Sequence, residues 1–273
     1  MIQSTARPEP APEGGVQLVR EWTPPGQPIG DVVLVHGIGE HSGRYERTGS
    51  LLAEGGYRVR GFDLIGFGAS SGERGDVHRW SLYLDQIQEH LGAARTPDRP
   101  LVLLGHSMGG LLALEYALAE RPQPDLLVLS APGLSGGEAW QRKLAPVLGR
   151  ALATTRFPTR VKGEMLSKDP AVGEAYFADP LVLTKATARL GAAIFAAGDR
   201  VRAHLDRLSI PTLVIHGGDD SLVPTPSSEL LAGSTLVERR VFESLRHELL
   251  NEPEGPDVVR EVLDWIKEKA GGG

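Results

Sequence analysis

Short apolar segments alternate with longer helical patterns along most of this 273-residue chain. Five of the short segments are rich in β-forming residues, and most are nearly continuous in apolar ones, at residues 31–35, 57–62, 101–104, 126–129 and 212–215. Helical patterns lie between and after them, at residues 44–54, 80–94, 108–120, 227–231 and 257–269. Strands that alternate with helices predict right-handed crossovers and an α/β fold with a mainly parallel central sheet flanked by helices.

The ends of the chain depart from this pattern. Residues 16–22 alternate apolar and polar side chains, as a half-buried strand does, and residues 236–242 form a last, more polar strand. Residues 1–15 are rich in Pro, Glu and Gly and lack the apolar stretch of a secretory signal. We therefore expect residues 1–15 and 271–273 to be flexible tails and the protein to be cytoplasmic.

The alternation breaks once, between Ser130 and Pro211. No clear strand pattern occurs there, and the stretch is too long to be a bare loop in a compact domain. Residues 138–153 have an amphipathic helical pattern. We therefore predict a helical cap, or lid, at residues 136–198 over a core formed by residues 16–135 and 199–270.

The predicted cap is strongly basic. Residues 142–168 hold one acidic side chain, Glu164, and seven basic ones: Arg142, Lys143, Arg150, Arg156, Arg160, Lys162 and Lys168. One interpretation is a solvated helix face. The other is peripheral docking on anionic lipid surfaces, with Trp140, Leu144 and Leu148 as its apolar side.

Composition excludes several kinds of chemistry. The chain has no cysteine, which excludes disulfides, thiolate metal sites and cysteine nucleophiles. Its 35 acidic and 29 basic residues are spread along the chain, and this mild acidity argues against a nucleic-acid partner. The turn at residues 63–70 lacks the third glycine of a dinucleotide-binding motif, and no His, Asp or Glu set has zinc-site spacing. We therefore expect no cofactor and no metal.

A G-x-S-x-G match at residues 105–109 places Ser107 between an apolar strand and an apolar helix. This context is typical of a nucleophile elbow, in which a sharp turn presents the serine hydroxyl. The serine of such a turn has a positive φ and needs small neighbours, which Gly105, Gly109 and Gly110 provide. The alternative is a Gly-rich turn with an idle serine. The context favours Ser107 as a nucleophile.

A serine nucleophile needs a general base and an acid that orients the base, and in this topology the acid precedes the histidine in the chain. The strand at residues 212–215 is followed by Asp219 and Asp220, and either carboxylate could orient the base. Of the eight histidines, only His247 follows the last strand. Chain order therefore selects His247 as the base.

Backbone N–H groups must stabilise the negative charge that develops on the substrate oxygen. The residue after the nucleophile, Met108, supplies one such group in this kind of site. The Gly-rich loop after the strand at residues 31–35 permits a tight path that puts the N–H of Ile38 near Ser107. A plain Gly-rich turn is the alternative interpretation of that loop.

Taken together, these residues resemble the monoacylglycerol lipase-like serine hydrolases of the α/β-hydrolase superfamily, over residues 32–266. The most specific matches are His36-Gly37-Ile38-Gly39-Glu40-His41-Ser42-Gly43-Arg44-Tyr45, Asp63-x-x-Gly66-x-Gly68-x-Ser70 with Gly72-Glu73-Arg74, Gly105-His106-Ser107-Met108-Gly109-Gly110, Asp179-Pro180-Leu181 and Gly217-x-x-Asp220. The resemblance implies an α/β-hydrolase fold with the cap inserted after its sixth strand. It also implies that Asp220 rather than Asp219 is the acid, and it supports Ile38 and Met108 as oxyanion donors.

The resemblance further implies that Glu40, Arg44 and Tyr176 line a polar pocket for a glycerol-like head group. One departure concerns this pocket, because Leu250 stands where the family has a histidine, three positions after the base. That departure implies a broader range of carboxylic esters. A second departure is that no clear strand precedes Val16.

The expected activity is cofactor-free cleavage of an ester with an apolar acyl chain and a small polar alcohol, such as a monoacylglycerol, through an acyl-enzyme. Two alternatives remain open at this stage. One is an amide hydrolase resembling proline iminopeptidase, which would need an acidic cluster for the substrate amine. The other is a non-enzymatic binding protein with the hydrolase fold.

Overall fold

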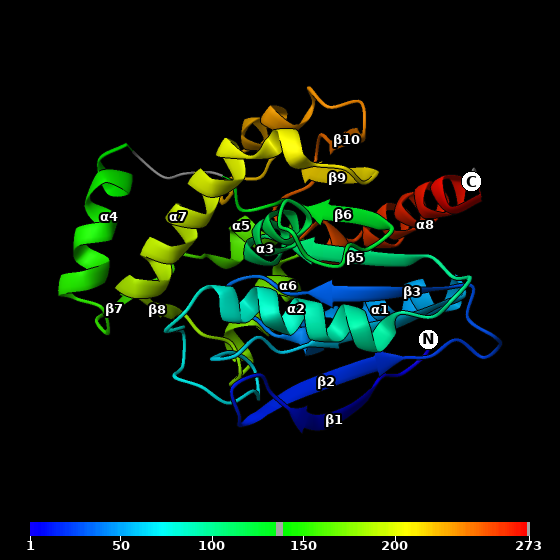
Figure 1. Cartoon of the computed structure of the whole chain (residues 1–273), viewed down its shortest axis with the longest axis horizontal. Coiled ribbons are helices and arrows are strands. Elements are labelled where there is room, and N and C mark those ends of the chain that lie inside the picture. Colours follow the sequence, from blue (N-terminus) through cyan, green and yellow to red (C-terminus); the bar gives the residue numbers. More distant parts are fainter. Residues whose placement is uncertain (135–138, 272–273) are drawn as a thin grey trace.

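The computed structural model describes residues 1–134 and 139–271, with the backbone alone for residues 139–143. Its central feature is an eight-stranded sheet in the order β1-β2-β4-β3-β5-β6-β9-β10 (Figure 1). The strands are β1 (Thr5–Pro10), β2 (Val16–Trp22), β3 (Gly30–Val35), β4 (Tyr57–Phe62), β5 (Leu101–His106), β6 (Leu126–Ser130), β9 (Thr212–Gly217) and β10 (Val237–Phe242). β2 is antiparallel to β1 and to β4, whereas every neighbouring pair from β4 to β10 is parallel. The predicted α/β fold with a mainly parallel sheet is confirmed.

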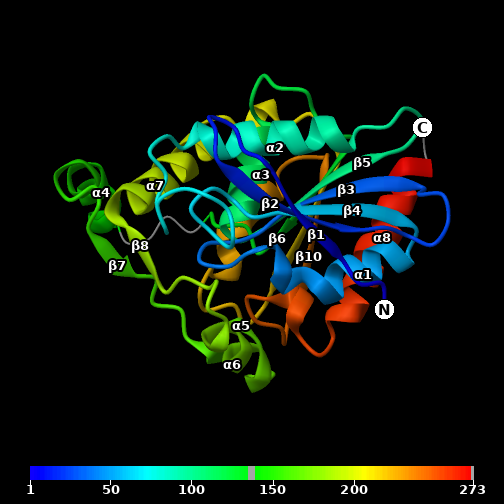
Figure 2. The same ribbon diagram turned by 90° about the horizontal axis from the view of Figure 1, so that it is seen from below.

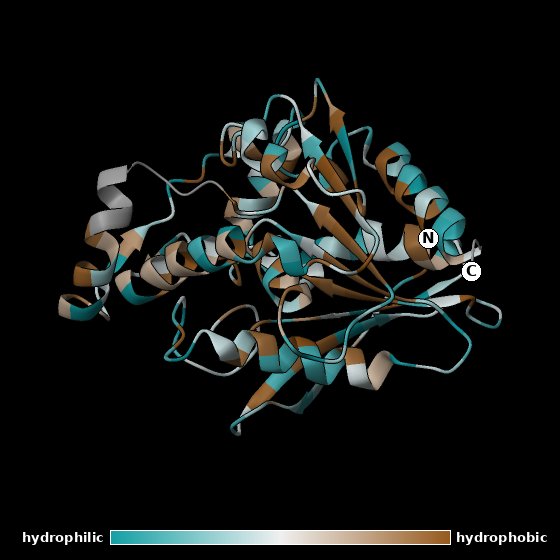
Figure 3. Ribbon diagram, turned by 45° about the horizontal axis from the view of Figure 1, so that its top comes forward, coloured by the Kyte–Doolittle hydropathy of each residue, from teal (hydrophilic) through white to brown (hydrophobic). Residues whose placement is uncertain are grey.

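Helices cover both faces of this sheet (Figure 2). α2 (Ser81–Ala94), α3 (Met108–Ala117) and α7 (Ala188–Ala203) lie on one face, and α1 (Glu46–Glu54) and α8 (Gly255–Gly271) lie on the other. Each face has its own cluster of buried apolar side chains. Because both faces are covered, every residue of β5 and of β9 is buried, and Figure 3 shows the central strands as the most hydrophobic part of the molecule.

The N-terminal segment differs from its expected structure. Residues 5–10 are not a flexible tail but form β1, which pairs with β2 from Thr5 opposite Glu21 to Pro10 opposite Val16. Ion pairs support the ladder, because Arg7 contacts Glu21 at 2.7 Å. Most side chains of β1 are exposed, so the strand has no apolar pattern by which the sequence could have indicated it.

The chain between β6 and β9 forms α4 (Ala139–Ala151), β7 (Arg156–Pro158), α5 (Gly163–Leu166), α6 (Pro170–Ala178), β8 (Lys185–Thr187) and then α7. The expectation that this stretch has no strand is wrong, because β7 and β8 pair antiparallel with each other. Each has only three residues and neither joins the central sheet, so neither gives a recognisable pattern. α7 continues to Ala203, past the expected boundary at residue 198.

Short 3₁₀ helices connect several of these elements: η1 (Ser42–Tyr45), η2 (Leu205–Arg207), η3 (Thr225–Leu231) and η4 (Leu249–Asn251). The helix predicted at residues 227–231 is therefore 3₁₀ rather than α-helical. Within the described ranges, no helix is long and apolar enough to cross a bilayer.

Candidate active site

Ser107 lies at the sharp turn between β5 and α3. Its φ of 54° and ψ of −118° lie outside the regions that a serine ordinarily adopts. The surrounding backbone leaves no room for other side chains: a Cβ at Gly105 would overlap the carbonyl oxygen of Gly109, and a Cβ at Gly109 would overlap that of Val35. The glycines of the motif therefore allow the strained turn that presents the Ser107 hydroxyl.

A continuous chain of hydrogen bonds joins Ser107, His247 and Asp220. Ser107 Oγ lies 3.0 Å from His247 Nε2, and His247 Nδ1 lies 2.7 Å from Asp220 Oδ2. The carboxylate can only accept, so Nδ1–H donates to Asp220 and Nε2 is left to accept the hydroxyl proton of Ser107. The structure thus brings together the three residues that chain order and resemblance selected.

Hydrogen bonds hold Asp220 as an anion. Its Oδ1 accepts hydrogen bonds from the backbone N–H groups of Leu222 at 2.9 Å and Val223 at 2.8 Å. Burial opposes the charge, but hydrogen bonds from His216 and His247 outweigh it and lower the pKa of Asp220. The side chain of Asp219 is exposed at the surface, so the geometry agrees with Asp220 as the acid.

Two further histidines are buried near Ser107 and are kept neutral. Burial, together with the nearby His247, lowers the pKa of His106 to about 3. Burial also lowers the pKa of His36, whose Nε2 accepts a hydrogen bond from the backbone N–H of Leu64 at 2.9 Å. Its Nδ1–H donates to the carbonyl oxygen of Gly37 at 2.7 Å, so His36 fixes the start of the loop that approaches Ser107.

That loop passes directly beside the nucleophile. A Cβ at Gly37 would lie 3.1 Å from the Ser107 Cβ, which shows how closely the backbone approaches. Ile38 lines the same cavity as Ser107, and Met108 begins α3 directly after it. The loop therefore has the close approach that an oxyanion donor at Ile38 requires, and Met108 has the position in the elbow that the second donor requires.

A cavity of about 170 Å³ opens above Ser107 and His247. Both apolar and polar side chains contribute to its wall. The lining residues are Gly37, Ile38, Glu40, His106, Ser107, Thr159, Val161, Leu166, Tyr176, Leu222, Val223, His247 and Glu248. Residues from the segment between β6 and β9 therefore complete the cavity that the core begins.

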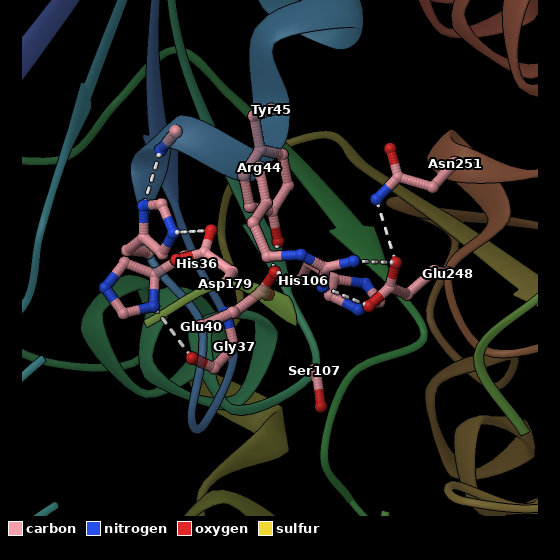
Figure 4. A network of polar contacts seen from close by, with 12 residues as sticks. His36, Gly37, Glu40, Arg44, Tyr45, His106, Ser107, Asp179, Glu248 and Asn251 are labelled. Atoms are coloured by element: carbon pink, nitrogen blue, oxygen red, sulfur yellow. Dashed lines mark hydrogen bonds and ion pairs between the residues drawn. The ribbon is translucent and has the colours of Figure 1, made fainter. Parts of the chain in front are cut away.

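The three expected head-group residues lie close together: Glu40 and Tyr176 line the cavity, and Arg44 contacts both of them. Figure 4 shows Arg44 beside Glu40. The guanidinium of Arg44 lies 4.7 Å from the centre of the Tyr176 ring and 3.4 Å from Glu40 Oε2. Glu40 Oε1 accepts hydrogen bonds from the N–H of Gly37 and the hydroxyl of Tyr45, both at 2.6 Å. The Tyr176 hydroxyl is buried and has no hydrogen-bond partner in the described part of the chain.

Glu248 is a site residue that the sequence analysis missed. It binds Arg44 through both carboxylate oxygens, with Oε1 2.5 Å from Nη1 and Oε2 2.9 Å from Nη2 (Figure 4). The available signal was its position directly after His247, which puts it at the same edge of the sheet. Its partner is 204 residues away in the chain, and no local pattern reveals such a pair.

Two contacts tie the loop at residues 37–43 to the segment between α6 and β8. His41 Nε2–H donates to Asp179 Oδ2 at 2.8 Å, because Gly43 N–H occupies the other ring nitrogen. The backbone N–H of Leu183 donates to the Gly39 carbonyl oxygen at 2.7 Å. The loop that carries Ile38 is thus held from its outer side by residues inserted between β6 and β9.

The loop of His247 is tied to the same insertion. The backbone N–H of Glu248 donates to the Leu166 carbonyl oxygen at 2.8 Å. The carboxylate of Glu252 is fully buried and accepts hydrogen bonds from the Arg246 backbone N–H at 2.8 Å and from the Ser167 hydroxyl at 2.5 Å. α5 and the residues after it therefore form part of the support for His247.

Within the described residues, no group of three or more His, Asp and Glu side chains is arranged to hold a metal ion. The chemistry that the site can perform is that of an activated serine: the strained turn exposes the hydroxyl, His247 can take its proton, and Asp220 fixes the imidazole. Such a site at the carboxyl edge of a mainly parallel sheet defines an α/β hydrolase.

Comparison with known proteins shows the family to which the chain belongs. It belongs to the serine aminopeptidase S33 family, whose model matches residues 26–254. It is 35% identical over 263 residues to a monoacylglycerol lipase of Mycolicibacterium smegmatis, which covers 93% of this chain and 94% of that protein. It is also 31% identical over 243 residues to the phospholipase YtpA of Bacillus subtilis, and this match covers 86% of this chain and 93% of that protein.

A solved structure extends the likeness to three dimensions. The monoacylglycerol lipase of Paleococcus ferrophilus superposes on this chain with a TM-score of 0.81 at 30% identity, covering 92% of this chain and 98% of that one. The family membership that the motifs indicated is confirmed.

Proposed function

We propose that this protein is a carboxylic ester hydrolase that cleaves monoacylglycerols or closely similar esters. The observation that carries the proposal is the hydrogen bond between Ser107 Oγ and His247 Nε2 at 3.0 Å, in a cavity that also holds Glu40 and Tyr176. The likeness to monoacylglycerol lipases over more than nine tenths of the chain supports the substrate class.

The proposed mechanism proceeds through an acyl-enzyme. Ser107 Oγ attacks the ester carbonyl while His247 Nε2 takes its proton, and the N–H groups of Ile38 and Met108 bind the resulting oxyanion. Collapse of this intermediate expels the alcohol, which receives the proton from His247. Water, deprotonated by His247, then attacks the acyl-enzyme. Collapse of this second intermediate releases the carboxylic acid, and His247 returns the proton to Ser107 Oγ.

The polar side of the cavity supports an uncharged polyol as the alcohol. Carboxylate oxygens of Glu40 and Glu248 can accept hydrogen bonds from hydroxyl groups, and the unpartnered Tyr176 hydroxyl can donate or accept. Glu248 lies close to Leu250, which stands where related lipases are expected to have a polar histidine. Glu248 therefore provides a polar group in that part of the site.

An amide-cleaving aminopeptidase is the second candidate, because the matching family carries that description. Such an enzyme needs carboxylates free to bind the ammonium group of its substrate. Here the two acidic residues of the cavity, Glu40 and Glu248, both contact Arg44, which favours the ester. Turnover of 1-octanoylglycerol and of proline p-nitroanilide, compared under the same conditions, tests the choice. We expect hydrolysis of the glyceride alone, and preferential cleavage of the anilide would overturn the proposal.

We also propose that the cap, residues 136–198, binds lipid surfaces. α4 exposes Leu144, Val147, Leu148 and Arg150, and Leu152 is exposed directly after it; the exposed fractions of the four apolar residues are 39% to 62%. The side chains of Trp140, Arg142 and Lys143, which belong to the same expectation, lie outside the described residues. An apolar, basic surface of this kind fits peripheral binding to anionic membranes.

Sedimentation with vesicles tests this contact. Binding should occur with anionic vesicles, weaken with added salt and be absent with neutral vesicles. The paired changes Lys143→Glu and Arg150→Glu should abolish the binding and spare turnover of p-nitrophenyl butyrate. Equal sedimentation with both kinds of vesicle would favour the interpretation as a solvated helix face.

A further inference from the structure

Glu248 occupies a position from which it controls the charge of the cavity. Its side chain is 5% exposed and lines the cavity beside Ser107 and His247. Both of its oxygens bind Arg44, and Oε2 also accepts a hydrogen bond from Asn251 Nδ2 at 2.9 Å. The carboxylate is therefore fixed in orientation from two sides.

Arg44 would be an anion receptor if Glu248 were absent. A guanidinium binds carboxylate and phosphate groups through two parallel N–H donors, and Glu248 now fills that pair of donors. Burial opposes the charge of Arg44, but the carboxylates of Glu248 and Glu40 outweigh it and raise its pKa, so the side chain is always charged. A substrate anion would have to compete with Glu248 for the same donors.

The sum of charges points the same way. Glu40 and Glu248 contribute two negative charges against the one positive charge of Arg44, and their side chains are all at most 8% exposed. His106 adds no charge, because burial lowers its pKa to about 3. The polar side of the cavity thus carries one uncompensated negative charge, which repels an anionic head group strongly where water is largely excluded.

We propose that Glu248 is a specificity-determining residue, which occupies the two donors of Arg44 and so restricts the alcohol side of the cavity to uncharged head groups. This arrangement excludes esters whose alcohol carries a phosphate group. Polyol alcohols can bind, because their hydroxyl groups donate hydrogen bonds to the carboxylates. The inference rests on the proposed function, because it concerns the alcohol part of the ester that Ser107 attacks.

The variant Glu248→Gln tests the proposal, because it removes the charge and keeps the size of the side chain. The two substrates are 1-octanoylglycerol and 1-octanoylglycerol 3-phosphate, which share one acyl chain and differ in the charge of the alcohol. The readout is the ratio of their kcat/KM values. A ratio within one preparation is independent of the fraction of protein that is correctly folded.

In the wild-type protein the ratio should favour the neutral ester by about 100-fold or more, and Glu248→Gln should reduce this preference about 10-fold or more through faster turnover of the phosphate ester. The second change Arg44→Met, made in the Glu248→Gln background, should remove this gain. The matched control is Glu254→Gln, which makes the same change at a 46% exposed side chain paired with Lys168 and should leave the ratio as in the wild type.

Different failures have different meanings. A wild-type protein that cleaves p-nitrophenyl butyrate but neither acylglycerol would overturn the proposed substrate class and this inference with it. Hydrolysis of the neutral glyceride with an unchanged ratio in Glu248→Gln would overturn the role of Glu248 alone. A wild-type protein that cleaves both acylglycerols equally well would do the same.

Discussion

The carboxylate of Glu252 accepts a hydrogen bond from the backbone N–H of Arg246 at 2.8 Å, one residue before His247. The same side chain receives the Ser167 hydroxyl and the Lys168 N–H, so it joins the histidine loop to the insertion between β6 and β9. Glu252 does not line the cavity around Ser107. Its effect on the reaction must therefore pass through the placement of His247.

Glu252→Gln should lower kcat about 10- to 100-fold with little change in KM, because a misplaced base slows the chemical step without altering the binding surface. Steady-state kinetics on p-nitrophenyl butyrate, with a melting curve for each protein, gives the two parameters. Ser167→Ala removes only one of the three hydrogen bonds and should have a smaller effect. A rise in KM at constant kcat would contradict the positioning role.

The two adjacent aspartates should respond very differently to the same change. Asp220→Asn should lower kcat about 10³- to 10⁴-fold, because an asparagine no longer holds the His247 tautomer that accepts the proton of Ser107. Asp219→Asn should cost much less, because that side chain is exposed. Turnover of a soluble short-chain ester by the two variants measures the difference. A larger loss of kcat in Asp219→Asn than in Asp220→Asn would show that Asp219 is the acid.

Stability should depend on pH through the buried His90. Burial and the adjacent Arg60 guanidinium lower the pKa of His90 to about 3, whereas the unfolded chain should show the usual value of about 6.5. Between these values the unfolded state binds a proton that the folded state does not, so the free energy of unfolding falls as pH falls from about 6.5 toward about 3. One such histidine contributes a slope of up to about 1.4 kcal/mol per pH unit.

The variant His90→Gln isolates this contribution. Urea unfolding at pH 7, 6 and 5 should show a shallower loss of stability in the variant than in the wild type. The comparison of slopes is unaffected by the constant loss of packing against Phe62, on which the His90 ring stacks at 3.9 Å. Identical slopes would show that His90 is protonated in the folded protein or neutral in both states.

The sequence indicated those features that have a local pattern. The nearly continuous apolar runs around Val33 and Leu103 predicted covered strands, and the glycines around Ser107 predicted the sharp turn, because each follows from the geometry of a few consecutive residues. The assignment of His247 followed from chain order in the fold and needed no contact information.

What the sequence did not indicate depends on contacts between distant segments. β1 has mostly exposed side chains, and its pairing with β2 leaves no apolar alternation to detect. Glu248 and Glu252 look like ordinary surface glutamates after a loop, yet their partners Arg44 and Ser167 lie 204 and 85 residues away. Buried polar contacts between such distant residues follow no periodic pattern in the sequence, so only the folded arrangement reveals them.

The central claim is that Ser107 is the nucleophile of an ester hydrolase, and covalent labelling tests it most directly. The wild-type protein and Ser107→Ala are treated with a fluorophosphonate, the labelled peptide is found by mass spectrometry, and hydrolysis of 1-octanoylglycerol is measured in parallel. We predict a single adduct on Ser107, no adduct in the variant, and a loss of kcat of about 10⁴- to 10⁶-fold with the fold retained. An adduct on another residue, or a variant that keeps more than about a tenth of the activity, would contradict the account.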